Sequence, residues 1–205
     1  PEQEAIAARF VGARMAGAAL PGFPGAIPAT LEEAYLVQDA GIARMAAPIG
    51  GWKVGRILPP QSGQYGADRL AGPIFSKSIL SAQPGQAPAG HIYVGGFGAA
   101  EAELLLRLKR TPPPRRHFSL DEAAELIDRV HVGLEIASSP LKTINELGPP
   151  VIISDFGNNN GLIVGPEITD WRSQDIANLP VSMSIDGRAV GTGSAAAFTD
   201  GPIGS

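Results

Sequence analysis

The sequence contains no cysteine among its 205 residues. Disulfides, thiolate metal sites and cysteine nucleophiles are therefore excluded, and the absence is typical of a reducing compartment. Long apolar runs are missing too, since no stretch approaches the roughly 18 to 20 residues that span a bilayer. The first residues carry charges within an amphipathic pattern and do not form a signal-peptide core. We expect a cytoplasmic protein that does not act at a membrane.

Basic clusters and nucleotide motifs are also lacking. The formal net charge is -4, and no basic block or aromatic RNA-binding motif occurs, so a nucleic acid partner is not expected. The glycines include neither a G-x-G-x-x-G that opens a helix nor a Walker A pattern, which argues against nucleotide binding. With 44% hydrophobic residues, the chain has the composition of a globular protein with one large core or two small ones.

The N-terminal part, residues 1–49, is predicted to be helical. Apolar residues recur on one face of a helix over residues 2–20, and a loop with three prolines follows. The capping box TLEE, formed by Thr30 and Glu33, then begins a second helix.

The rest of the chain, residues 50–205, is predicted to be β-rich, because glycines and prolines separate short apolar runs. One helix is expected at SLDEAAELIDRV, where Ser119 and Glu122 form a capping box. Asp186 and Gly187 predict a hairpin turn within VSMSIDGRAVG. The other expected strands are GGWKVGRI, PIFSKSIL, HIYVGGF, AAEAELLLRL, HVGLEIA, PVIIS and GLIVGPEI. The fold class is therefore α+β, with a helical start.

Acidic residues stand out in two of these strands. In AAEAELLLRL, alternation places Glu101 and Glu103 on one face with Leu105 and Arg107. The other face carries Ala102, Leu104, Leu106 and Leu108. In HVGLEIA, Glu135 lies between Gly133 and Ala137, two small residues that leave room around its side chain. A solvated strand face is the more common reason for such a pattern, and the spacing alone leaves both interpretations open.

Convergence of the three carboxylates would change their chemistry. Their mutual repulsion would require either protonation or a bound cation. Oxygen ligands without cysteine, and without histidine at a suitable spacing, favour a hard divalent ion, Mg²⁺ or Mn²⁺, over zinc. A site of this kind with open coordination positions could chelate a substrate.

Lys53 lies in the alternating run GGWKVGRI and shares a strand face with Gly51 and Gly55. An exposed lysine on a strand is the common case. The alternative is a lysine directed into a glycine-lined cavity, where burial lowers its pKa and neighbouring carboxylates raise it. A lysine in that position can act as a proton donor or a base.

The order of these motifs, GGWKVG, YGADRLAGPIF, EAE, GLEIASS and ISDFGNNNGLIVG, resembles one enzyme group. It is the 2-keto-4-pentenoate hydratase and 4-oxalocrotonate decarboxylase group of the fumarylacetoacetate hydrolase-like superfamily. The resemblance runs from about Thr30 to the last residue. It implies a barrel-like or β-roll body, similar to the C-terminal domain of fumarylacetoacetase, with a helical N-terminal part.

The resemblance also implies roles for residues. Three glutamates would hold Mg²⁺ or Mn²⁺, Lys53 would be the acid/base residue, and three loop residues would contact the substrate. The metal ligands are Glu101, Glu103 and Glu135, and the substrate contacts are Asp155, Asn158 and Asn159.

The sequence departs from the group in two places. The loop around Asp155 contains Phe156 and Gly157 and is one residue longer than the usual pattern. The group continues beyond FTDGPIGS into a further segment, so we expect this chain to be a fragment, or the remainder to be a separate piece or disordered.

The resemblance implies a metal-dependent hydratase that adds water to a 2-hydroxy-2,4-dienoate of the 2-keto-4-pentenoate type. Its product would be a 4-hydroxy-2-oxo acid in aromatic catabolism, and a homo-oligomer is expected. The nearest alternative is a decarboxylase of 4-oxalocrotonate type, which shares the enolate chemistry. A fumarylacetoacetate or acylpyruvate hydrolase is less favoured, because no histidine precedes His91. A non-catalytic paralogue is the remaining alternative.

Overall fold

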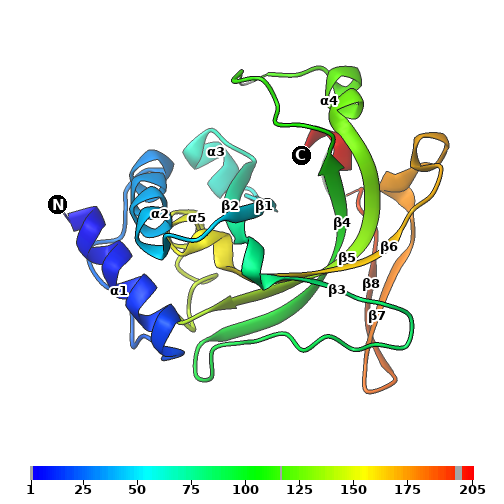
Figure 1. Ribbon diagram of the computed structural model, residues 1–205. Helices are drawn as coiled ribbons and strands as arrows, with labels where there is room; N and C mark the ends of the chain where they lie inside the picture. Colours follow the sequence, from blue (N-terminus) through cyan, green and yellow to red (C-terminus); the bar gives the residue numbers. More distant parts are fainter. Residues whose placement is uncertain (1, 116, 197–199) are drawn as a thin grey trace. The chain divides into compact units, whose positions relative to one another are not determined.

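The computed structural model describes residues 2–115, 117–196 and 200–205 (Figure 1). Contacts between Cα atoms divide the chain into two compact units. Unit 1 comprises residues 1–80, 88–101 and 135–163, and unit 2 comprises residues 81–87, 102–134 and 164–205. The division into a helical part up to residue 49 and a catalytic body after it stays a prediction.

Unit 1 begins with two helices, α1 (Glu2–Ala16) and α2 (Leu31–Met45), which lie side by side (Figure 1). Thr30 caps α2, since its side chain accepts a hydrogen bond from the Glu33 backbone N–H, as the sequence predicts. The Glu33 carboxylate reaches the backbone of Ala29 rather than that of Thr30. Buried apolar residues of both helices form one core with three later residues; the cluster is Ile6, Ala7, Phe10, Val37, Leu141, Ile144 and Val151.

Two antiparallel strands carry the predicted lysine. They are β1 (Ile49–Arg56) and β2 (Arg69–Phe75), joined through the short helix α3 (Gln61–Tyr65). Their register places Lys53 opposite Gly72. The chain then passes through a 3₁₀ turn at Ser76–Ser78 into β3 (Ile79–Ser81).

The acidic residues lie on a four-stranded sheet with the order β3-β6-β5-β4. Its longer strands are β4 (Phe97–Leu108), β5 (Ile127–Ser139) and β6 (Asn159–Glu167). Although the helix α4 (Leu120–Leu126) separates them in the sequence, β4 and β5 are hydrogen-bonded neighbours, and this pairing can bring their side chains together. As the alternation predicts, Leu104 and Leu106 pack against a buried apolar cluster.

Unit 2 contains α4 (Leu120–Leu126), the hairpin of β7 (Val181–Ile185) and β8 (Arg188–Gly193), and three short 3₁₀ turns. The turns are Trp171–Ser173, Ile176–Asn178 and Pro202–Gly204. Both predicted local signals are confirmed: the capping box of Ser119 and Glu122 is formed, and Asp186 and Gly187 turn the hairpin with positive φ.

Two element predictions are wrong, and a third element is shorter than predicted. PVIIS forms the helix α5 (Pro149–Ser154), because prolines at its start have the φ that the first helical turn needs. HIYVGGF forms turns before β4 begins at Phe97, with Gly95 at positive φ. The predicted helix at SLDEAAELIDRV stops at Leu126, and Ile127 and Val130 enter β5, where they pack with Trp171.

Helices and sheets are thus combined as predicted, but the barrel-like detail is not confirmed. The described strands form three separate sheets and no closed barrel. Within the described ranges, none of the helices combines the length and apolarity required to cross a membrane.

Candidate metal centre

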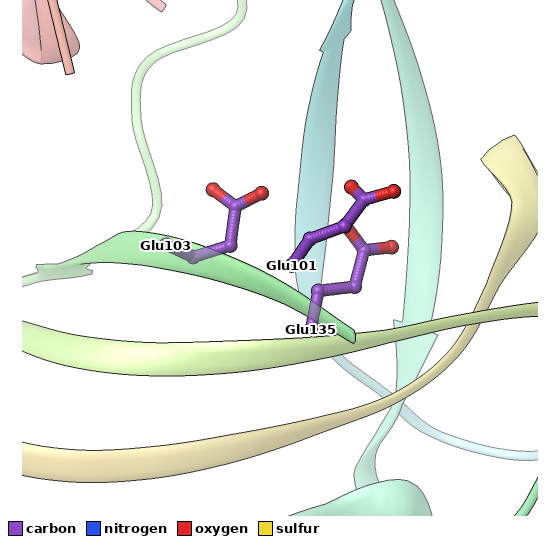
Figure 2. A group of neighbouring side chains, drawn as sticks. All are labelled: Glu101, Glu103 and Glu135. Carbon is purple, nitrogen blue, oxygen red and sulfur yellow. The ribbon is translucent and has the colours of Figure 1, made fainter. Parts of the chain in front are cut away.

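The three predicted glutamates come together on adjacent strands. Glu101 and Glu103 lie on β4 and Glu135 lies on β5, and one carboxylate oxygen of each falls within 4.8 Å of the others. Figure 2 shows the three side chains rising from the same side of the two strands, with Glu101 next to Glu135. The sequence pattern would also fit a solvated strand face, but in the structure the three carboxylates converge.

Glu135 is the buried member of the cluster, with 1% of its surface exposed. Its Oε1 accepts a hydrogen bond of 2.9 Å from Asn159 Nδ2, and its Oε2 lies 3.2 Å from Lys53 Nζ. Burial raises the pKa of Glu135, although the charge of Lys53 and the Asn159 hydrogen bond lower it in part. The charge of Glu101 also acts to raise it.

Lys53 reaches Glu135 along a path lined by glycines. A Cβ on Gly157 would lie 3.0 Å from Lys53 Cδ, and one on Gly55 would lie 3.7 Å from Lys53 Cε. Gly72, opposite Lys53 in the hairpin, approaches the Phe156 carbonyl so closely that a Cβ would lie 2.2 Å from its oxygen. The glycines let the loop after α5 approach the β1–β2 hairpin, so the lysine side chain, 13% exposed, is packed along its length.

The donor set fits a hard divalent cation. Three carboxylates converge, and one lysine ammonium contacts the buried one. Oxygen ligands of this kind suit Mg²⁺, Mn²⁺ or Ca²⁺ and are a poor match for zinc. The three glutamates are the residues that could hold such an ion.

Asp155, one of the predicted substrate contacts, is fully buried. Its Oδ1 lies 2.5 Å from Arg14 Nε, and its Oδ2 accepts a hydrogen bond of 2.6 Å from Ser139 Oγ. Both carboxylate oxygens are thus bound within the protein. Whether Asp155 also contacts a substrate stays a prediction.

The two predicted asparagines have different surroundings. Asn159 donates to Glu135, whereas Asn158 donates to Asn145 at 3.4 Å. The Oδ1 of Asn158 is buried and has no hydrogen-bond partner among the described residues. An unpartnered buried oxygen is costly unless a donor reaches it, so Asn158 offers a free acceptor in this loop.

Arg14 is a residue of the site region that the sequence reasoning missed. It belongs to α1, and its guanidinium is buried against Asp155. A signal was available, since Arg14 follows Phe10 by four positions on the apolar face of the helix. A charged residue in that register needs a buried partner.

Comparisons with known proteins point to one kind of protein. No family model matches the chain. A curated 4-oxalocrotonate decarboxylase of Pseudomonas sp is 29% identical over 206 residues, covering 97% of this chain and 75% of that protein. Among solved structures, 4-oxalocrotonate decarboxylase from Pseudomonas putida G7, complexed with magnesium and adipate, matches with a TM-score of 0.78 and 22% identity. The same enzyme complexed with calcium and acetate matches with a TM-score of 0.76 and 20% identity.

The resemblance predicted from the motifs is confirmed. The match to each of the two decarboxylase structures covers 98% of this chain and 76% of the decarboxylase chain. At these identities the structural likeness establishes the fold.

Proposed function

We propose that the protein is a metal-dependent decarboxylase that acts on a small unsaturated 2-oxo dicarboxylic acid of the 4-oxalocrotonate type. One observation carries the proposal: three carboxylates converge within 4.8 Å, and a lysine contacts the buried one. It gains support from the 29% identity to 4-oxalocrotonate decarboxylase over 97% of the chain.

Glu101, Glu103 and Glu135 would hold Mg²⁺ or Mn²⁺. When bound, the ion would act as a Lewis acid that stabilises negative charge on the 2-oxygen of the substrate. The similar decarboxylase was solved with magnesium and adipate, and adipate is a six-carbon dicarboxylate, the same length as 4-oxalocrotonate. This ligand supports a small dicarboxylic acid as the substrate.

Lys53 would manage the proton in this reaction. Loss of CO₂ breaks one carbon-carbon bond, and the electron pair moves along the conjugated chain toward the 2-oxygen, so the product must gain one proton. Lys53 Nζ lies 3.2 Å from Glu135 Oε2 and would donate this proton. It would regain a proton from water.

The loop after α5 would complete the substrate site. Asn158 has a buried Oδ1 without a described partner, which suits a donor group on the substrate or on an ordered water. Asn159 is the second proposed contact, although its amide N–H already reaches Glu135. Asp155 would contribute through the loop conformation that its two hydrogen-bonded oxygens maintain.

The hydratase, which the motifs favoured first, is less well supported. The comparisons name the decarboxylase, and the glutamates and Lys53 suit both reactions equally because both pass through an enolate. We retain hydration as the second candidate. A homo-oligomer and a cytoplasmic location stay predictions.

Two substrates separate the candidates. The purified protein would be incubated with Mg²⁺ and either a 2-oxo-hexenedioate or a 2-hydroxypentadienoate, while absorbance and released CO₂ are followed. We expect one CO₂ for each dicarboxylate consumed. Consumption of the dienoate without CO₂ would instead identify a hydratase, and no reaction with either acid would contradict both proposals.

Matched variants test the assigned centre. Glu101→Gln removes one proposed ligand, so we expect it to lose most of the activity and to weaken Mg²⁺ binding. Glu125→Gln makes the same change on the exposed α4 and should behave as the wild type. Equal activity of the two variants would show that the cluster is not the metal centre.

A further inference from the structure

Arg14 contacts more of the protein than an ion pair requires. Besides the contact to Asp155 Oδ1, its guanidinium donates to backbone oxygens of three residues and to one side-chain oxygen. The acceptors are Asn159 O at 3.0 Å, Asp155 O at 3.2 Å, Ser138 O at 3.4 Å and Asn160 Oδ1 at 3.4 Å. One buried side chain of α1 therefore fixes the end of β5 and the loop that leads into β6.

Aromatic rings set the orientation of the guanidinium. Its central carbon lies 5.0 Å from the ring centroid of Phe156 and 5.5 Å from that of Tyr93. The Tyr93 hydroxyl in turn donates to Asn160 Oδ1 at 3.0 Å. A planar group that is stacked and bonded on several edges has little freedom to rotate.

Asn159 connects this arrangement to the metal centre. Its backbone oxygen accepts from Arg14, whereas its side-chain Nδ2 donates to Glu135 Oε1 and, at 3.4 Å, to Gly161 O. A peptide group that is held in place fixes the direction of the adjoining Cα–Cβ bond. The Arg14 contact at the backbone thus determines where the amide of Asn159 can reach.

We propose that Arg14 is a positioning residue for the metal centre, which it reaches through Asn159. The chain of contacts runs from the guanidinium to the Asn159 carbonyl, then through the Asn159 side chain to Glu135. This inference rests on the proposed function, because Glu135 matters here as a proposed metal ligand. Hydrogen bonds to a ligating carboxylate orient it and tune metal affinity.

The test uses Mn²⁺ alone as the probe. Arg14→Lys keeps a positive charge beside Asp155 but lacks the planar fork that reaches Asn159, Ser138 and Asn160 together. We expect Arg14→Lys to weaken Mn²⁺ binding about tenfold by calorimetry, in the range typical of outer ligand partners. Asn159→Ala should weaken it to a similar extent.

A double-mutant cycle separates positioning from general destabilisation. If Arg14 acts through Asn159, Arg14→Lys should cause no further loss of Mn²⁺ affinity in the Asn159→Ala background. Ile6→Ala, which removes a buried side chain from the same helix, should lower the thermal stability while Mn²⁺ affinity stays unchanged. Losses that multiply in the double variant, or an equal loss in Ile6→Ala, would overturn the inference.

A second readout needs no metal. In the metal-free, ¹⁵N-labelled protein, the side-chain amide resonance of Asn159 reports its hydrogen bond to Glu135, and we expect Arg14→Lys to shift it while Ile6→Ala does not. An unshifted resonance would overturn the inference. If the wild type binds no Mn²⁺ but the resonance shifts, the proposed function fails while the link from Arg14 to Glu135 stands.

Discussion

Two buried ion pairs in unit 1 are built differently. Arg14 and Asp155 lie 2.5 Å apart with side chains 6% and 0% exposed, and both carboxylate oxygens have donors. Lys53 and Glu135 lie 3.2 Å apart with side chains 13% and 2% exposed, and the carboxylates of Glu101 and Glu103 converge with that of Glu135. The second pair therefore belongs to a cluster of three carboxylates that suits a divalent cation.

The difference separates a pair that maintains structure from one that can react. Burying charge costs several kcal/mol for each ion unless partners compensate it, so removing one member of the first pair is costly. Convergent carboxylates repel one another, and a bound cation would relieve this repulsion. We therefore expect stability to depend most on Arg14, and activity to depend most on Lys53.

The largest expected effect is on turnover. Lys53→Met removes the proposed proton donor and should lower kcat for decarboxylation about 10²- to 10⁴-fold, the range typical of general acid-base groups. Lys77→Met, at an exposed position, serves as the control. If Lys53→Met retained full activity, Lys53 would not be the proton donor, and the Lys53–Glu135 pair would not be the reactive one.

The largest effect on folding is expected at the other pair. Arg14→Met leaves the buried Asp155 without its cation and should lower the free energy of unfolding by about 3–5 kcal/mol, as measured by urea denaturation. Arg44→Met breaks an exposed pair with Glu4 and should cost about 1 kcal/mol or less. The comparison fails if Lys53→Met destabilises the protein more than Arg14→Met does.

A smaller effect concerns pH. Because the pKa of Glu135 in the folded protein is raised, its stability contribution is present below the unfolded pKa and is lost as the pH rises through the folded pKa. Mn²⁺ binding requires the ionised form and should relieve this loss. Saturating Mn²⁺ should therefore raise Tm more at pH 8 than at pH 5, as measured by calorimetry. An equal rise in Tm at both pH values would contradict the assignment of Glu135 as a metal ligand.

Local sequence patterns predicted the caps and turns of the fold and, within the candidate metal centre, the shared strand face of Glu101 and Glu103. The two-residue period of a strand requires Glu101 and Glu103 to share a face, and Leu104 and Leu106, which follow them, pack on the other side. Caps and turns at Thr30, Ser119 and Asp186 were also readable, because each depends on residues only a few positions apart.

Features that depend on residues far apart in the sequence were harder to predict from the sequence. The approach of Glu135 to Glu101 depends on β5 pairing with β4, and no local rule specifies strand neighbours. The run PVIIS has strand-forming residues, but tertiary packing buries it as a helix, with Val151 and Ile153 in two different clusters. Arg14 shows the opposite case: its position on an apolar helix face pointed to a buried partner, but not to which one.

Three consecutive asparagines follow Gly157, and their separate contacts make the length of this segment critical. Asn158 contacts Asn145, Asn159 contacts Glu135, and Asn160 contacts both Tyr93 and the His91 backbone. The residues are chemically identical, so their tasks are assigned only by where the backbone places each one. Deleting any one of the three asparagines would give the same sequence, because the residues are identical and consecutive. In that shortened protein at least one of these contacts is lost.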